Sequence, residues 1–176
     1  MPRLMKLKKN IITVLKSTEI LKHLDYKIND SHIKTGLNNV SNNTGLQGRW
    51  QVIQRKPMII CDTAHNEAAL GEVISQLMDM EYSDLHFIIG FSNDKNLKKI
   101  SKIFPEDSKY YFVQSKVGRA RDAKEVRDIF KLNNRCGDYY KSIENTIKYV
   151  KGVSKDNDII FIGGSTFVVS EIFDKN

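Results

Sequence analysis

The feature that most constrains the fold of this chain is a series of short apolar runs, each followed by a polar loop and a helical pattern. Four runs have the length and composition of buried strands, namely Met58–Cys61, Leu85–Gly90, Tyr110–Val113 and Asp158–Ile162. Strands that alternate with helices favour a parallel sheet, because a right-handed crossover between parallel strands needs a helix. We therefore predict an α/β domain with a mainly parallel sheet and helices on both of its faces. A further strand, Trp50–Gln54, is predicted ahead of Pro57.

Two short helices are predicted before this domain. The first has an apolar stripe formed by Leu7, Ile11, Val14, Leu15, Leu21 and Leu24. The second carries Ile33, Leu37 and Val40 on one face, with Asp30 or Ser31 as its cap. A polar, turn-forming segment, Ser41–Gly45, follows. We place the domain boundary there, with residues 1–46 as a helical segment and residues 47–176 as the α/β domain.

The charge of the chain is unevenly distributed. The net charge is +7, but residues 1–46 hold eight Lys or Arg against three Asp or Glu, whereas the remainder holds twenty against eighteen. A solvated helix face, an acidic partner domain and weak nucleic-acid contact are the alternative explanations of the basic segment. The sequence has neither an apolar run of about 18 residues nor a signal-peptide pattern, which predicts a cytoplasmic protein without a membrane partner.

Polar side chains follow the predicted strands at the points where the strands end. The carboxyl ends of parallel strands meet at one edge of a sheet, where open α/β sheets bind ligands. The residues that this topology collects at the edge are Asp62, His65, Asn66, Asp94, Lys95, Lys116, Arg119 and Ser165. The sequence therefore predicts a ligand site at this edge.

The residue types at this edge suggest specific chemistry. An ionised Asp62 can accept hydrogen bonds from two ribose hydroxyls, and Arg49 offers a planar fork for phosphate or carboxylate. His65 can stack, donate a hydrogen bond or bind a metal. Each has a structural alternative, since a strand-end Asp often caps a helix, an Arg after Gly is often a surface residue and a lone His is usually structural.

Two further segments have anion-binding potential. Gly163–Thr166 can hold an anion with backbone N–H groups and a hydroxyl, although a tight turn explains the glycines equally well. Lys116, Arg119 and Arg121 form a possible basic cluster, for which a solvated loop is the alternative. The chain contains no G-x-x-x-x-G-K-[ST] phosphate loop and no G-x-G-x-x-G after a strand.

At these residues the chain resembles the folylpolyglutamate synthase and dihydrofolate synthase enzymes of the Mur ligase superfamily. Gly48-Arg49 with Asp62-Thr63-Ala64-His65-Asn66 is similar to the family's G-R … D-G-A-H-N pattern. The other similar segments are Gly90 with Asp94-Lys95-Asn96, Arg119-Ala120 with Asp122-Ala123, and Gly164-Ser165 with Phe167. Thr63 departs from the family, which usually has Gly there. The resemblance implies a Rossmann-like three-layer domain.

The resemblance also implies a function. Such ligases phosphorylate the carboxylate of a folate or dihydropteroate with ATP and Mg, and L-glutamate then attacks the acyl phosphate. Residues 1–46 would be the tail of an N-terminal ATPase domain that carries the phosphate loop and the magnesium ligands, so we assign no metal ligand and no catalytic residue to this chain. By carry-over, Arg49, Asp62, His65 and Asn66 contact ATP, and Ser165 belongs to the glutamate pocket. This chain alone would be inactive.

Two other functions remain as alternatives from the residues themselves. One is a stand-alone nucleotide- or nucleic-acid-binding module that uses the basic N-terminal helices. The other is a stand-alone hydrolase that uses Asp62 and His65 with a metal.

Overall fold

The structure is a computed structural model that describes residues 4–173, with side chains from residue 11 onward. The predicted apolar position Leu7 therefore lies outside the described side chains. The chain divides into two compact units between Gln47 and Gly48, and each unit is described by itself. Over residues 4–173, none of the helices combines the length and the apolar character needed to cross a membrane.

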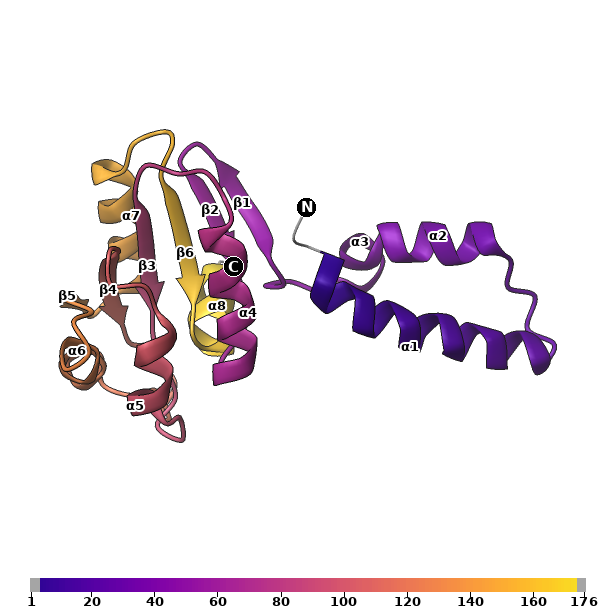
Figure 1. Ribbon diagram of the computed structural model, residues 1–176, viewed down its shortest axis with the longest axis horizontal. Coiled ribbons are helices and arrows are strands. Elements are labelled where there is room, and N and C mark those ends of the chain that lie inside the picture. The colour runs from indigo at the N-terminus through magenta and orange to yellow at the C-terminus, as the bar shows by residue number, and fades with distance from the viewer. Residues whose placement is uncertain (1–3, 174–176) are drawn as a thin grey trace. The chain divides into compact units, whose positions relative to one another are not determined.

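The first unit consists of three helices, α1 Leu4–His23, α2 Asp30–Asn38 and α3 Val40–Thr44 (Figure 1). The cap of α2 is Asn29, whose side chain accepts a hydrogen bond from the His32 backbone N–H, and not Asp30 or Ser31 as predicted. The predicted second helix is also interrupted, because Asn39 leaves helical geometry with a φ of −115°. Its side chain donates to the Thr35 carbonyl, which also accepts the Asn39 backbone N–H, and such a local side-chain bond competes with helix continuation.

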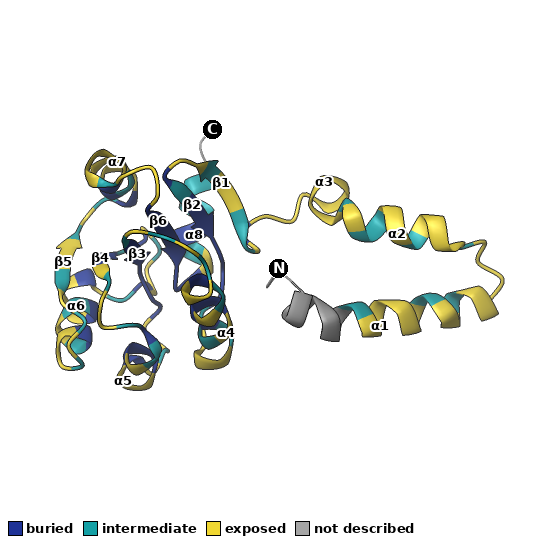
Figure 2. Cartoon of the chain, turned by 45° about the horizontal axis from the view of Figure 1, so that its top comes forward, coloured by how far each residue is buried: buried dark blue, intermediate teal, exposed yellow. Residues whose placement is uncertain are grey.

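The apolar side chains of this unit remain accessible. None of residues 11–46 is buried, and Figure 2 shows these helices in the colours of intermediate and exposed residues. The most exposed aliphatic side chains are Ile12 at 67%, Leu24 at 63% and Ile20 at 54%. Most helical stability in proteins comes from packing of an apolar face, so this unit lacks the burial that ordinarily stabilises a helix.

The second unit contains a six-stranded sheet in the order β1-β2-β6-β3-β4-β5. All neighbouring strands are parallel except β1 and β2, which form an antiparallel hairpin. The strands are β1 Gln51–Arg55, β2 Met58–Cys61, β3 Leu85–Ile89, β4 Lys109–Val113, β5 Gly137–Tyr140 and β6 Ile159–Gly163. The predicted mainly parallel α/β sheet is confirmed.

Helices cover both faces of this sheet (Figure 1). They are α4 Glu67–Met78, α5 Leu97–Ile100 with the 3-10 turn η1 Ser101–Ile103, α6 Ala123–Lys131, α7 Ile143–Val153 and α8 Thr166–Phe173. Because side chains alternate along a strand, Ile60 and Phe161 pack on the face of α4, α5 and α6, whereas Ile59 and Ile160 pack with α7 and α8. The sheet and its two helical faces form the predicted three layers.

Two strands differ from the sequence prediction. The first strand begins at Gln51 and not at Trp50, whose φ of +46° is incompatible with extended backbone. Strand β5 at the sheet edge was not predicted as a strand, because Gly137-Asp138-Tyr139-Tyr140 lacks a continuous apolar run. Glycine is needed at 137, since a Cβ there would lie 2.1 Å from the Tyr110 carbonyl oxygen.

Candidate functional site

A cavity of about 280 Å³ lies at the carboxyl edge of the parallel strands. The loops that follow β2, β3, β4 and β6 contribute to it, as does the start of α8. Its lining consists of His65, Ser92, Asp94, Lys95, Arg119, Ser165, Thr166 and Phe167. The cavity thus brings together five residues that the sequence placed at this edge: His65, Asp94, Lys95, Arg119 and Ser165. Arg49, Asp62, Asn66 and Lys116 lie outside its lining.

Two glycines at the end of β6 let the backbone segments approach one another behind the cavity. A Cβ at Gly163 would lie 2.6 Å from the Asp62 carbonyl oxygen. Gly164 has a φ of +85°, and a Cβ there would lie 2.8 Å from the Gly90 carbonyl oxygen. The buried Ser165 follows, and its hydroxyl accepts a hydrogen bond from the Phe167 N–H at 3.2 Å. The glycines therefore serve a tight strand-to-helix turn that presents Ser165 and Thr166 at the cavity.

The Asp62 carboxylate organises the segment before β1. It is 6% exposed, and its two oxygens accept the backbone N–H groups of Trp50 at 2.7 Å and Ala64 at 2.8 Å. Residues 50 and 64 belong to different segments, so one side chain ties the start of the β1–β2 hairpin to the loop after β2. Each oxygen retains a second lone pair, which leaves the carboxylate able to accept a further hydrogen bond.

Gly48, two residues before Trp50, is also fixed to the loop after β2. Its φ is +68°, its carbonyl accepts the Thr63 N–H at 2.8 Å, and a Cβ there would lie 2.7 Å from Val169 Cγ1 and 2.8 Å from Thr63 Cγ2. Only glycine fits such a position without displacement of its neighbours. Arg49 therefore sits between two fixed residues, with its side chain exposed. Within residues 11–173 it forms no hydrogen bond or ion pair, so its guanidinium is free to bind an anion.

His65 and Asn66 have different local roles although they are adjacent. The Nδ1 atom of His65 lies 3.0 Å from the Thr63 carbonyl oxygen. A carbonyl only accepts, so this contact places the proton on Nδ1 and leaves the Nε2 lone pair available in the neutral ring. The Asn66 side chain is the cap of α4 and accepts the Ala69 N–H at 2.9 Å. One lone pair of its side-chain oxygen is thereby used, and its side-chain amide N–H groups remain available.

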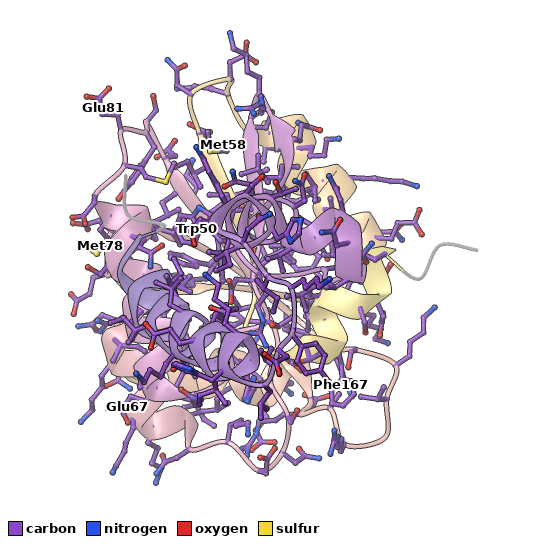
Figure 3. All side chains as sticks on the ribbon, turned by 90° about the vertical axis from the view of Figure 1, so that its right-hand side faces the viewer. Trp50, Met58, Glu67, Met78, Glu81 and Phe167 are labelled. Atoms are coloured by element: carbon purple, nitrogen blue, oxygen red, sulfur yellow. The ribbon has the colours of Figure 1, made fainter. Side chains whose placement is uncertain are left out.

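The cavity contains two cations and one carboxylate in addition to His65. Lys95 Nζ lies 2.6 Å from Asp94 Oδ2, and this hydrogen bond lowers the pKa of the Asp94 carboxyl. The Arg119 guanidinium lies 4.5 Å from the ring centroid of Phe167, which is labelled in Figure 3. Lys95, Arg119 and Asp94 together carry one net positive charge. The cavity can therefore receive a small molecule with more than one anionic group and a cationic group.

The predicted basic cluster of Lys116, Arg119 and Arg121 does not exist as one site. Arg119 lines the cavity, whereas Arg121 is bonded to backbone carbonyls of the loop after β3 and is not part of the lining. The Lys116 side chain is exposed, and its backbone N–H donates to Glu171 on α8. Thr166 lay within the segment Gly163–Thr166 that the sequence predicted to hold an anion, whereas sequence reasoning did not place Ser92 and Phe167 in the site. Their position directly after β3 and at the start of α8 was the signal that could have identified them.

A second polar cluster lies at the opposite, amino edge of the same strands. The ligand atoms of Asp84, His86 and Asp158 all lie within 4.8 Å of one another. The Asp158 oxygens accept the backbone N–H groups of Asp84 and Lys155, and His86 Nε2 lies 3.2 Å from Oδ2. The other ring nitrogen of His86 lies 3.3 Å from the Tyr111 hydroxyl. Because these atoms satisfy one another, the cluster is a hydrogen-bonded structural network.

Burial and hydrogen bonds together set the protonation of this network. Burial lowers the pKa of His86, against the opposing effect of the Asp158 hydrogen bond. Burial alone would raise the pKa of Asp158, but hydrogen bonds from the Lys155 N–H, His86 and the Asp84 N–H hold it below its usual value. A neutral His86 that donates from Nε2 to an ionised Asp158 is consistent with both shifts.

The fold and the site define a class of protein: an α/β domain with a polar ligand cavity at the carboxyl edge of its sheet. Residues 48–166 match the family described as the Mur ligase, glutamate ligase domain. The match spans more than half of the chain, and the chain belongs to this family.

Curated relatives bear out the family resemblance. The chain is 28% identical over 149 residues to the dihydrofolate synthase/folylpolyglutamate synthase of Buchnera aphidicola subsp. Schizaphis graminum, with 82% of this chain and 34% of the relative covered. It is 29% identical over 148 residues to the enzyme of the same name from Buchnera aphidicola subsp. Acyrthosiphon pisum, with 83% and 34% covered. The chain spans about a third of the length of these relatives.

Solved structures share the fold. A bifunctional folylpolyglutamate synthase/dihydrofolate synthase from Yersinia pestis CO92 has a TM-score of 0.72 at 20% identity, over 89% of this chain and 36% of its own. A bifunctional synthase of the same description, with Mn, AMPPNP and L-glutamate bound, has a TM-score of 0.75 at 20% identity, over 89% and 37%. The folylpolyglutamate synthase of Mycobacterium tuberculosis complexed with ADP has a TM-score of 0.73 at 14% identity, over 88% and 37%.

Proposed function

We propose that this chain is the C-terminal part of a cytoplasmic, ATP-dependent ligase that adds L-glutamate to a folate or dihydropteroate carboxylate through an acyl phosphate. The observation that most strongly supports this proposal is the cavity at the carboxyl edge of the sheet, in a chain that belongs to the glutamate ligase domain family. Folate ligases among the relatives and an L-glutamate complex among the structural neighbours support this substrate class.

The chemistry of the cavity suits glutamate. This amino acid has two carboxylates and one amino group, and the cavity offers Lys95 and Arg119 as cations and Asp94 as an anion. Ser165 adds a hydroxyl in the same space, which supports its assignment to the glutamate site. A volume of about 280 Å³ has room for a molecule of this size.

Four residues are proposed to contact ATP. Arg49 would face the phosphates, where a guanidinium stabilises the charge that develops during phosphoryl transfer. Asp62 would accept hydrogen bonds from the ribose with its remaining lone pairs, while its other contacts hold Arg49 in place. His65 and Asn66 would complete this loop, since Nε2 of the one and the amide N–H groups of the other remain available.

The reaction also needs parts that these residues do not supply. We propose that an N-terminal ATPase domain holds the phosphate loop and the Mg, and that residues 1–46 are its tail. The accessible apolar side chains of the helical unit support this proposal, because such faces ordinarily pack against a further surface. Closure of two domains over ATP would exclude water that hydrolyses an acyl phosphate. This chain alone is then expected to be inactive as a ligase.

The test uses Arg49→Ala in the full-length protein, with ADP formation measured in the presence of folate and glutamate. Loss of a cation that stabilises the transition state is expected to lower kcat by about 100- to 1,000-fold. Arg55→Ala is the matched control, since Arg55 is an exposed arginine on strand β1, which begins two residues after Arg49 in the chain. Equal rates in Arg49→Ala and the wild type would refute the role of Arg49. A wild type without glutamate-dependent ADP formation would refute the function.

A further inference from the structure

The loops after β3 and β4 are joined to each other before they reach the cavity. Ser92 and Ala120 form an isolated antiparallel bridge. The Asn93 N–H donates to the Arg119 carbonyl at 3.0 Å, and the Arg121 N–H donates to the Phe91 carbonyl at 2.8 Å. The two loops thus carry Asp94 and Lys95 on one side and Arg119 on the other as one hydrogen-bonded unit.

The Arg121 side chain adds a second connection within this unit. Its Nη2 atom donates to the Asn93 carbonyl and, at 3.3 Å, to the Lys95 carbonyl. These carbonyls belong to the residues immediately before and after Asp94, so one guanidinium group holds the backbone on both sides of that residue. Its Nη1 atom donates to Glu125 Oε1 at 2.7 Å, which anchors the group to α6.

Arg121 is built into the protein and does not face the ligand. Its side chain is 16% exposed, and it is not among the residues that line the cavity. The Asp94 side chain, by contrast, is 66% exposed, and the Lys95 side chain is 24% exposed. The position of the exposed Asp94 side chain therefore depends on its backbone, which the Arg121 side chain holds together with the hydrogen bonds between the two loops.

We propose that Arg121 is a positioning residue that fixes Asp94 and Lys95 in the geometry with which the cavity binds the amino-acid substrate. This inference rests on the proposed function, from which the amino-acid substrate is taken. Arg121 itself is assigned no contact with the substrate or with ATP. The positioning role requires arginine, since a planar fork reaches two carbonyls and a carboxylate at once. A lysine ammonium keeps the charge but lacks this fixed geometry.

The test compares Arg121→Met and Arg121→Lys with the wild type in the full-length protein. Displacement of Asp94 and Lys95 is expected to raise KM for glutamate by about tenfold in Arg121→Met, with KM for ATP changed by less than about twofold. Arg121→Lys should recover part of the loss. Arg127→Met is the matched control, because Arg127 lies on α6, to which Arg121 is anchored, and bonds to Asp128 but not to either loop.

A second readout does not depend on activity. Amide hydrogen exchange of residues 93–96 should accelerate in Arg121→Met, while exchange in β3 and β6 stays as in the wild type. Unchanged exchange at 93–96 would overturn the proposal, as would faster exchange with an unchanged KM for glutamate. If the wild type shows no glutamate-dependent turnover, the proposed function fails instead, and hydrogen exchange still decides whether Arg121 holds this loop.

Discussion

The two edges of the parallel sheet carry similar residue types but differ in how their polar atoms are used. At the amino edge, His86 and Asp158 are 0% and 1% exposed and bond to each other and to neighbouring backbone. At the carboxyl edge, Arg119 is exposed, and Lys95 shares the cavity with it. Satisfied and buried groups stabilise a fold, whereas accessible groups with spare bonding capacity can bind a ligand. Residue type alone therefore does not separate a structural cluster from a site.

The largest expected effect is loss of stability at the amino edge. Asp158→Ala removes the acceptor of two backbone N–H groups and of His86, and is expected to lower the free energy of unfolding by about 3 kcal/mol. Chemical denaturation of this chain measures the change. Asp156→Ala, an exposed carboxylate two residues earlier, should change it by about 0.5 kcal/mol or less. Similar losses in both variants would show that the network adds no special stability.

A smaller effect is the pH dependence of this network. The folded protein holds His86 with a lowered pKa, so the unfolded chain binds the proton first as the pH falls below the ordinary value of 6.5. Stability should therefore be complete above that pH and fall below it, by no more than about 1.4 kcal/mol per pH unit for one proton. The groups that surround the ring are Asp158, Asp84, Lys109 and Tyr111.

The measurement is the free energy of unfolding of wild type and His86→Gln at pH values on both sides of 6.5. The glutamine does not titrate, so the variant should be less stable at neutral pH and show a shallower acid slope. His32→Gln is the control, because His32 is exposed in the helical unit. Parallel pH profiles for wild type and His86→Gln would rule out His86 as the source of the slope.

The smallest expected effect on stability belongs to the carboxyl edge. Arg119→Gln removes an exposed guanidinium from the face of Phe167 and should cost about 0.5 kcal/mol of unfolding free energy. In the full-length protein the same variant is expected to raise KM for glutamate. A stability loss as large as that of Asp158→Ala would mean that Arg119 is a structural residue, and the contrast between the edges would fail.

The sequence predicted much of the fold because buried parallel strands have a strong local signal. Their continuous apolar runs identified β2, β3, β4 and β6 together with the edge at which a site would form. Strand β5 was not predicted because its residues at the sheet edge are only partly buried and form no continuous apolar run. Two of its four residues are Gly137 and Asp138. The break at Asn39 was not predicted because the apolar period continues through Val40, although the Asn39 side chain bonds locally to the Thr35 carbonyl.

The candidate site was predicted less completely. Asp62, His65 and Ser165 were predicted at the carboxyl edge of the sheet from their position after strands. Of these residues, His65 and Ser165 line the cavity. That Asp62 bonds to the Trp50 N–H could not be read from the chain, since these residues meet only when β1 folds back on β2. The binding roles of these residues remain predictions.

By itself, the sequence determined the four buried parallel strands and the edge at which the polar loops gather, because apolar runs and turn residues act locally. Only the tertiary structure decided which polar side chains face the cavity. Arg119 and Arg121 are two residues apart in one loop, yet the first lines the cavity and the second binds the carbonyls of Asn93 and Lys95. The physical reason is that a hydrogen-bond partner from another loop exists only after the sheet has assembled.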